Sequence, residues 1–349
     1  MEILIGKHTL GSSHPVFIVA EMSANHGNSL NQALDLIKSA KRAGANAIKL
    51  QTYTPDTITI KSNKDDFKIP KDSPWAAYNN LWDLYKDGST PWEWHDAIFT
   101  EARKLDLEVF SSVFDESSVD YLESLNAPAY KIASLEITDI PLLEKTAKTQ
   151  KPVIISTGVG DLNDIELAIK TLRKYGNQEI IVLQCTSSYP APPEEANLLT
   201  IPDLVKRFGV IAGLSDHTIG AESSIAAVAL GASFIEKHFK IEHDNDSVDS
   251  FFSMGEKEFS KMVKSIRLTE QSLGKPCYEI TPSAEPRLKN RRSLYVIKPI
   301  KQGEVFTEKN IKSVRPALGL HPKYYRDILG KKSLKNLEIG DRLSWENIE

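Results

Sequence analysis

Short runs of β-branched and apolar residues alternate along the chain with segments whose apolar residues recur at helical spacing. Eight runs are candidate strands, at residues 16–22, 47–52, 108–114, 129–134, 152–158, 180–190, 210–216 and 234–240. Segments such as 30–45, 90–106 and 161–176 lie between them and are apolar at i, i+3, i+4 and i+7. Strands that alternate with helices pair in parallel, and eight such units predict an α/β fold of the TIM (β/α)8 barrel type.

A doubly wound open sheet is the other α/β architecture that this alternation permits. The first strand, however, leads into EMSANHGNS (21–29) and not into the GxGxxG turn that binds dinucleotides in such sheets. Several runs are also apolar almost throughout, which is typical of strands covered on both faces. The barrel is therefore the preferred fold.

The alternating pattern is interrupted in two places. Residues 53–89 form a long insertion after the second strand, and an insertion at that end of a barrel strand predicts a lid or a substrate loop. After residue 275, a proline-bearing basic segment leads to short strand-like pieces separated by glycine turns. We therefore divide the chain into a barrel domain (1–275), a linker (276–290) and a small β-rich domain (291–349).

Composition narrows the range of partners. The 349 residues carry a formal net charge of −4, which gives no basic excess for binding DNA or RNA. No run of about 18 apolar residues could span a bilayer, and MEILIGKHTL lacks the regions of a signal peptide. The two cysteines are too few for a disulfide framework. We expect a cytoplasmic protein that binds small molecules and has neither nucleic-acid nor membrane partners.

Almost every candidate strand ends in polar residues. They are Glu21, Asn25, His26, Lys49, Gln51, Ser111, Ser112, Lys131, Ser134, Ser156, Thr157, Gln184, Thr186, Ser187, Ser188, Tyr189, Ser215, Asp216, His217, Glu236, Lys237 and His238. Because the chemistry of a TIM barrel gathers at the carboxyl ends of its strands, we expect these side chains to surround one pocket. Two lysines among hydroxyl groups suit a phosphate or a carboxylate. Two histidines on adjacent strands, with Glu21 nearby through barrel closure, suit a divalent transition metal with open coordination positions.

Each of these residues also has an ordinary structural explanation. A lone histidine after an apolar run is more often a hydrogen-bonded structural residue than a metal ligand. Lysines are usually solvated, although Lys49 and Lys131 lie inside apolar runs. Cys185 lies within an apolar strand with no neighbouring base in sequence, which indicates a packed thiol and not a nucleophile. The recurrence of polar groups at all eight strand ends is what favours a functional site.

The same residues carry a resemblance to a known family. The series AEMSANHGNS, AIKLQTYTPDT, FSS, YKIAS, ISTG, CTSSYP, GLSDHTIG and IEKHF, in this order, resembles the sialic acid synthase (NeuB-type) family. The resemblance implies a TIM barrel followed by a C-terminal antifreeze-like (SAF) domain, whose marker loop is similar to SVRPALGLHP (313–322). It also implies the condensation of phosphoenolpyruvate with an N-acetylated aminosugar to give a nine-carbon 2-keto sugar acid.

Within this family, SANH, QTYTPDTIT, LWDLYKDGSTPWEWH and VRPALGLHPKYY are most similar to the branch that makes pseudaminic acid from a 2,4-diacetamido-2,4,6-trideoxy-hexose. One alternative is the same chemistry on N-acetylmannosamine or on the diacetamido precursor of legionaminic acid. The other is a sugar-binding scaffold that has lost catalysis. A scaffold needs neither Glu21 nor the pairs of lysines and histidines, so their presence favours an enzyme.

The resemblance also assigns roles to individual residues. Glu21 and His238 would be catalytic, with Glu21 as general acid or base, and His217 and His238 would bind manganese, with magnesium or cobalt as alternatives. The phosphoenolpyruvate ligands would be Lys49, Ser112, Lys131, Ser134, Ser156, Ser187 and Ser215. The aminosugar would meet Gln51, Tyr189 and Asp249. Arg315 of the small domain would reach it from the other subunit of a domain-swapped homodimer.

We expect the insertion at residues 53–89 to be the segment that recognises the methyl and second acetamido groups of the sugar. Trp75, Tyr78 and Trp82 would supply an apolar wall against these groups.

Overall fold

The computed structural model describes residues 1–244 and 246–349. The chain forms two compact units, Met1–Gly274 and Lys275–Glu349, and each has a hydrophobic core of its own. No helix among the described residues combines the length and the apolar character that crossing a bilayer requires.

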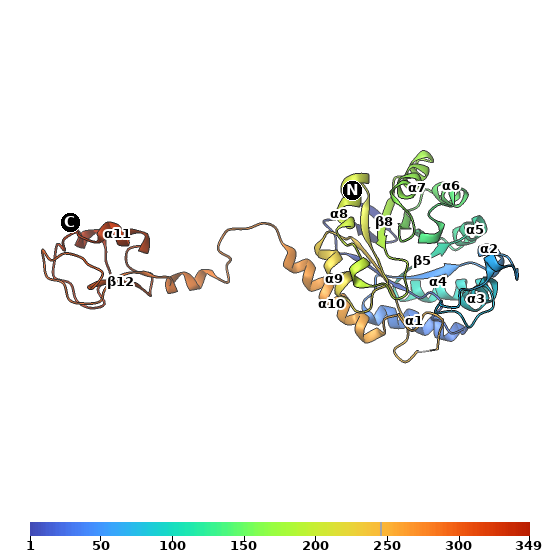
Figure 1. Ribbon diagram of the computed structural model, residues 1–349, viewed down its shortest axis with the longest axis horizontal. Helices are drawn as coiled ribbons and strands as arrows, with labels where there is room; N and C mark the ends of the chain where they lie inside the picture. The colour runs from blue at the N-terminus through green and yellow to red at the C-terminus, as the bar shows by residue number, and fades with distance from the viewer. Residues whose placement is uncertain (245) are drawn as a thin grey trace. The chain divides into compact units, whose positions relative to one another are not determined.

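Eight parallel strands close into a barrel in the first unit, in the order β10-β3-β4-β5-β6-β7-β8-β9 (Figure 1). They are β3 (Phe17–Glu21), β4 (Ala47–Thr52), β5 (Glu108–Val113), β6 (Tyr130–Ile132), β7 (Val153–Ser156), β8 (Ile180–Cys185), β9 (Ile211–Asp216) and β10 (Phe234–His238). Each run predicted as a strand contains one of them, so the predicted TIM barrel is confirmed. The run at 180–190 was predicted too long, because β8 ends at Cys185 and the following residues form a loop.

Helices cover the outside of the barrel (Figure 1). They are α1 (Leu30–Ala43), α4 (His95–Lys104), α5 (Glu116–Ser124), α6 (Ile140–Ala147), α7 (Leu162–Lys174), α8 (Thr200–Phe208), α9 (Glu222–Ala229) and α10 (Glu256–Leu273). Two further helices, α2 (Pro55–Ile58) and α3 (Leu81–Gly88), follow β4. Single 3-10 turns occur at Asp65–Phe67, Trp92–Trp94, Ser134–Glu136 and Pro193–Glu195. The three helical segments named from the sequence correspond to α1, α4 and α7, and the insertion at residues 53–89 folds into α2, α3 and the turns between them.

Local chemistry fixes the ends of these helices. The Asp161 side chain accepts hydrogen bonds from the backbone amides of Asn163 and Asp164 at the start of α7. At the end of α1, Gly44 adopts a left-handed conformation with a φ of 92°, which glycine enters without steric cost.

Side chains alternate along each barrel strand between the interior and the surrounding helices. In β3, Phe17 and Val19 belong to the interior cluster, whereas Ile18 and Ala20 pack beneath the helices. The interior positions are apolar where the strands begin and polar where they end, as Phe17 and Glu21 illustrate. The candidate functional side chains inside the barrel therefore lie at its C-terminal end.

A small hairpin, which the sequence analysis did not predict, precedes the barrel. Strands β1 (Ile3–Ile5) and β2 (His8–Leu10) pair antiparallel. Ile3, Ile5 and Leu10 are buried in the same cluster as the residues that begin the barrel strands, including Phe17. The hairpin therefore closes the N-terminal end of the barrel, opposite the polar end.

The second unit holds less regular structure than expected. Its elements are β11 (Ser293–Val296), β12 (Ile311–Val314), α11 (Tyr325–Ile328) and 3-10 turns at Glu285–Asn290, Pro322–Tyr324 and Trp345–Asn347. The predicted strand pieces EVFT and DRLSW make only isolated β-bridges, such as Val305 with Lys332 and Tyr295 with Arg342. Its core is a separate cluster that includes Leu294, Phe306 and Ile311.

Candidate active site

The polar strand ends divide into two groups, and only one group faces the barrel interior. Residues at interior strand positions are Glu21, Lys49, Gln51, Ser112, Lys131, Ser156, Ser215, Glu236 and His238. Asp216 and Lys237 occupy the alternate positions, so the expectation that they join the ring is wrong. They form a buried ion pair, 2.9 Å between Lys237 Nζ and Asp216 Oδ2, and Asp216 also accepts from Ser224 of α9.

Asn25 and His26 likewise serve the structure and not the pocket. The Asn25 amide donates to the backbone oxygen of Phe239 and to the Ser253 hydroxyl, at 3.0 and 2.8 Å. His26 is fully buried beside Trp94, with ring centroids 5.6 Å apart. Burial lowers the pKa of His26 to about 4, so this imidazole stays neutral.

A network of charges fills the barrel where the interior becomes polar. Lys49 Nζ lies 2.6 Å from Glu21 Oε2 and 3.7 Å from Glu236 Oε1, and Lys131 Nζ also lies 3.7 Å from Glu236 Oε1. Lys49 further donates to the Ser112 hydroxyl at 3.0 Å, and Ser215 donates to Glu236 at 3.1 Å. All of these side chains are buried. Buried lysines this close together create a strong positive potential that carboxylates partly balance.

The carboxyl groups of this network differ in their affinity for protons. Burial raises the pKa of Glu21 to about 7, although the Lys49 charge opposes this. Burial also acts on Glu236, but the charges of Lys131 and Lys49 prevail and lower its pKa. One carboxyl group is thus suited to carry a proton near neutral pH while its neighbour stays ionised, an arrangement common in acid–base sites.

Hydroxyl groups form a cradle beside the lysines. The Ser134 hydroxyl accepts from the Gly158 amide at 3.0 Å, and a Cβ on Gly158 would come within 2.2 Å of the Ser187 Oγ. Glycine at this position therefore leaves room between two serines. The Ser156 hydroxyl is buried without a hydrogen-bond partner among the described residues. A cradle of hydroxyl groups beside paired lysines has the chemistry of a phosphate or carboxylate site.

The structure brings His217 and His238 together. Their ring centroids lie 5.3 Å apart, and both side chains are buried. Nδ1 of His217 lies 2.9 Å from the backbone oxygen of Thr186. If Nδ1 carries the proton and donates to this oxygen, Nε2 keeps its lone pair. Burial lowers the pKa of His238 well below its usual value, and its buried Nδ1 has no partner among the described residues.

These two imidazoles fit a divalent metal ion. A neutral imidazole whose nitrogen has no partner inside a protein is unusual, and coordination would satisfy it. Across residues 1–244 and 246–349, no group of three or more His, Cys, Asp or Glu side chains is arranged to hold an ion. Two imidazoles would leave the remaining coordination positions for oxygen atoms of substrate or water.

Cys185 belongs to this site, which its interpretation as a packed core thiol missed. Its sulfur lies 3.9 Å from His217 Nδ1 and 3.6 Å from the Ser134 hydroxyl. Burial raises the pKa of the thiol, but the hydrogen bond and the charge of His217 outweigh it and lower the pKa to about 7. The period-2 pattern of β8 would have indicated that Cys185 faces the interior, as Ile181 and Leu183 do.

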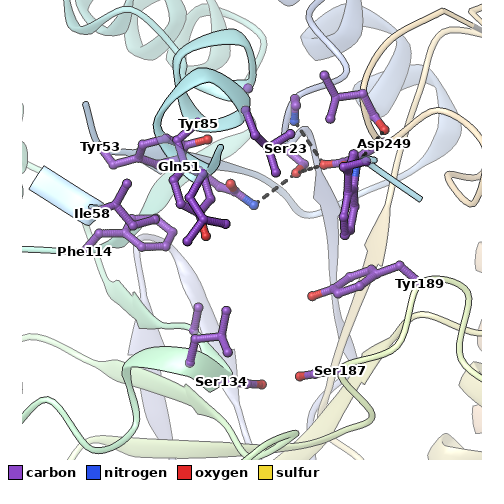
Figure 2. Close-up of a pocket in the computed structure, with 18 of the residues that line it drawn as sticks. Ser23, Gln51, Tyr53, Ile58, Tyr85, Phe114, Ser134, Ser187, Tyr189 and Asp249 are labelled. Carbon is purple, nitrogen blue, oxygen red and sulfur yellow. Dashed lines mark hydrogen bonds between the residues drawn. The ribbon is translucent and has the colours of Figure 1, made fainter. Parts of the chain in front are cut away.

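A cavity of about 500 Å³ lies at this end of the barrel. Its wall includes the predicted site residues Gln51, Ser134, Ser187, Tyr189 and Asp249 (Figure 2). His238 also lines it. Gln51 donates to Glu21 at 3.2 Å and to the Ser23 hydroxyl at 3.0 Å, and Ser23 in turn donates to Asp249. Three of the four residues expected to meet the sugar, Gln51, Tyr189 and Asp249, therefore line one cavity, and hydrogen bonds through Ser23 join two of them.

The insertion contributes to this cavity, but not with all of the expected aromatic residues. Trp75 lines it and packs edge-on to Tyr189, with ring centroids 6.0 Å apart. Trp82 instead donates to Asp56 at 2.8 Å and lies under the Lys61 ammonium group. The Tyr78 hydroxyl donates to Asp87 at 3.0 Å. Neither Trp82 nor Tyr78 lines the cavity, so their assignment to its wall is wrong.

Glu136 is a candidate functional residue that the sequence analysis missed. It follows the short strand β6 in a 3-10 turn and lines the cavity, where its Oε2 is buried without a partner among the described residues. Burial raises its pKa to about 7, against the charge of Lys131. The signal was weak, because a glutamate two residues after Ser134 looks in sequence like an ordinary helix-start residue.

Arg315 lies in the second unit, just after β12, and its side chain is exposed. Together with Arg287, Arg291 and Arg292 it lines a hollow of about 470 Å³. Four guanidinium groups around one hollow give a surface suited to anions.

Two family descriptions match the chain. The NeuB family matches residues 36–278, and the SAF domain matches residues 291–349. A pseudaminic acid synthase of Helicobacter pylori is 48% identical over 96% of this chain and 98% of its own length. A pseudaminic acid synthase of Campylobacter jejuni is 46% identical over 94% of this chain and 95% of its own.

Less similar proteins also match this chain over most of its length. The N,N'-diacetyllegionaminic acid synthase of Legionella pneumophila is 35% identical over 97% of this chain and 96% of its own length. Among solved structures, an N-acetylneuraminic acid synthetase of Leptospira borgpetersenii, in complex with citrate, superposes with a TM-score of 0.72 at 32% identity. That superposition covers 82% of this chain and 95% of the other.

Proposed function

The chain belongs to the NeuB family, and we propose that it catalyses the pseudaminic acid synthase reaction. In this reaction phosphoenolpyruvate, 2,4-diacetamido-2,4,6-trideoxy-β-L-altropyranose and water give pseudaminic acid and phosphate. The observation that carries the proposal is the greater identity, along nearly the whole chain, to two pseudaminic acid synthases than to the legionaminic acid synthase. The lysines, carboxyl groups, hydroxyl groups and histidines at the C-terminal end of the barrel would supply the charged groups and proton donors that such a reaction needs.

Phosphoenolpyruvate would occupy the ring of lysines and hydroxyl groups. Lys49 and Lys131 would neutralise its phosphate and carboxylate, and the ligands with hydroxyl groups would be Ser112, Ser134, Ser156, Ser187 and Ser215. Two features support this assignment: the space that Gly158 leaves between Ser134 and Ser187, and the unpartnered hydroxyl of Ser156. Charged groups held in place before the substrate arrives stabilise developing charge without reorganising.

His217 and His238 would hold a divalent ion, which we propose to be manganese, with magnesium or cobalt as alternatives. Such an ion, when bound, supplies a Lewis acid that polarises the aldehyde oxygen of the open-chain sugar. The backbone oxygen of Thr186 would orient the His217 ring for this task through the hydrogen bond to its Nδ1.

The carboxyl groups would move the protons of the reaction. A bond forms between C3 of the enol phosphate and the aldehyde carbon, and the aldehyde oxygen gains a proton. Water then adds to C2 and loses a proton. The C2–O bond to phosphate then breaks, the remaining hydroxyl proton passes to the departing phosphate, and the ketone forms. Glu21, with its pKa of about 7, is suited to one of these transfers, and Glu136 lines the same cavity with a similar pKa. Each can donate and accept a proton near neutral pH.

We also propose a domain-swapped homodimer in which Arg315 reaches the sugar of the partner subunit. Among the described residues Arg315 has neither a hydrogen-bond partner nor an ion-pair partner, and its side chain is exposed. A guanidinium group without hydrogen bonds or ion pairs to the described residues is available to bind a ligand.

Phosphate release from phosphoenolpyruvate tests the function directly. We expect manganese-dependent release with 2,4-diacetamido-2,4,6-trideoxy-altrose, and much slower release with the corresponding mannose derivative and with N-acetylmannosamine. Preference for either of the latter would reassign the substrate within the family. No release with any of the three sugars would contradict the enzyme function and favour a sugar-binding scaffold.

A further inference from the structure

The cavity at the C-terminal end of the barrel has an apolar side and a polar side (Figure 2). The apolar side consists of Tyr53, Ile58, Tyr85 and Phe114, which we call the apolar pocket. The polar side carries the hydrogen-bonded series Gln51, Ser23 and Asp249. A ligand that fills this cavity must therefore present apolar groups on one side and hydrogen-bonding groups on the other.

Aromatic packing gives the apolar pocket a defined shape. The ring of Tyr53 packs edge-on to Tyr85, with centroids 5.9 Å apart, and to Phe114, with centroids 5.0 Å apart. Tyr53 is only 5% exposed. Ile58 ends α2, and α2 and α3 both belong to the insertion, so the pocket joins the insertion to the ends of β4 and β5. Edge-to-face aromatic contacts of this kind hold rings in fixed orientations.

Two phenol hydroxyl groups in this wall, those of Tyr53 and Tyr85, have no hydrogen-bond partner within the described part of the chain. The Tyr53 hydroxyl makes no hydrogen bond within the described part of the chain, although burial of its ring is nearly complete. It lies next to Gly88, where an added Cβ would approach it to 3.1 Å, and both residues line the cavity. Burial raises the pKa of this phenol, so it remains a hydrogen-bond donor at physiological pH. The phenol oxygen is not among the fully buried polar atoms, so it opens to the cavity, where a ligand can supply its acceptor.

We propose that the apolar pocket binds the second acetamido group of the sugar, with the Tyr53 hydroxyl donating to its carbonyl oxygen. This inference rests on the proposed function. An acetamido group combines one strong acceptor with one methyl group, which matches the Tyr53 donor set against the carbon atoms of Ile58 and Phe114. N-acetylmannosamine offers a hydroxyl group instead of this acetamido group. It would leave the apolar wall in contact with a polar group, which costs binding energy when the hydroxyl lacks a partner.

The substitution Tyr53→Phe tests the proposal, because it removes the hydroxyl and keeps the ring. We expect kcat/KM for the diacetamido sugar to fall about 3- to 10-fold, as loss of one neutral hydrogen bond predicts. The value for N-acetylmannosamine should fall less, and KM for phosphoenolpyruvate should not change. Ile58→Ala should also weaken the preference for the diacetamido sugar, because it removes apolar contact without touching the hydroxyl.

Tyr78→Phe is the matched control. It makes the same change on the same insertion, but the Tyr78 hydroxyl is bonded to Asp87 and the residue does not line the cavity. Its preference among sugars should equal that of the wild type. An equal effect of Tyr53→Phe on both sugars, or no effect on either, would overturn the pocket while leaving the proposed function intact. Wild-type preference for N-acetylmannosamine would overturn both.

Discussion

At the scale of single residues, the direction in which a strand side chain points separates the candidate site from its support. Asp216 and His217 are neighbours in sequence, as are Lys237 and His238, yet each pair divides between the outside and the inside of the barrel. The two histidines meet inside, and the two charged residues meet outside. Strand periodicity predicts which residues face inside, because successive side chains on a strand point to opposite faces.

The histidine pair gives the first prediction. His217→Ala and His238→Ala should each lower the rate of phosphate release by a factor of at least about 100, if the ion they hold supplies several kcal/mol of transition-state stabilisation. Both variants should stay folded, since His238→Ala removes no hydrogen bond of Nδ1 and His217→Ala removes only those of its Nδ1 with the Thr186 backbone oxygen and the Cys185 sulfur. Bound manganese and circular dichroism would be measured beside activity.

His14→Ala provides the control for these variants, because the His14 imidazole pairs with Glu2 near the surface and such an ion pair adds little stability. It should bind manganese and release phosphate as the wild type does. Full activity of both His217→Ala and His238→Ala in chelator-treated buffer would contradict the metal site.

Glu136 gives a prediction about pH. Its pKa of about 7 in the folded protein lies above the usual value of 4.5, mainly through burial. The folded state therefore binds the proton more tightly, and this group's contribution to stability is full below about pH 4.5 and is lost as pH rises through 7. Glu136→Gln should remove this loss and raise the free energy of unfolding at pH 8, by at most about 3 kcal/mol.

Urea unfolding of wild type and Glu136→Gln at pH 5 and pH 8 would measure this difference. The gap between the two proteins should be larger at pH 8. A gap that is the same at both pH values would show that the Glu136 pKa is not raised in the folded protein. Activity provides a second readout, since the amide cannot transfer the proton that we assign to this carboxyl group.

At the scale of elements, the ion pair between Lys237 of β10 and Asp216 of β9 joins the two strands that carry the histidines. Lys237→Met should destabilise the protein by about 3–5 kcal/mol, because it leaves the Asp216 charge buried without its partner. The double variant Asp216→Asn with Lys237→Met should recover much of this loss. Chemical denaturation of the four proteins gives the coupling energy, and purely additive effects would contradict the pairing.

Most helices and strands of the barrel could be predicted from the sequence, whereas the hairpin before it and the contacts of the insertion could not. All eight barrel strands were predicted because apolar runs alternate with helical segments, and even the three-residue strand β6 lies in such a run, at 129–134. The hairpin β1–β2 was missed because its three-residue strands lie outside this alternation and show too little periodicity of their own. Trp82 and Tyr78 were misplaced because the partners of an irregular insertion, here Asp56 and Asp87, leave no periodic signal.

At the scale of the whole molecule, the proposed dimer makes a prediction that single variants cannot. Arg315→Ala and His238→Ala subunits should each be inactive alone. If Arg315 serves the partner's barrel, mixing and exchanging the two kinds of subunit should restore about a quarter of wild-type activity, because half of the dimers hold one intact site. No recovery after verified exchange would mean that Arg315 acts within its own chain or not at all.

The hairpin at the N-terminal end of the barrel also has a kinetic consequence. Ile3, Ile5 and Leu10 close that end, so the lysine ring is reached from the side of the cavity. A sugar seated in the cavity would then stand in the path of any anion bound for the ring. With the two substrates placed as proposed, we expect them to add in a compulsory order, phosphoenolpyruvate first, and we expect phosphate to leave after the sugar acid.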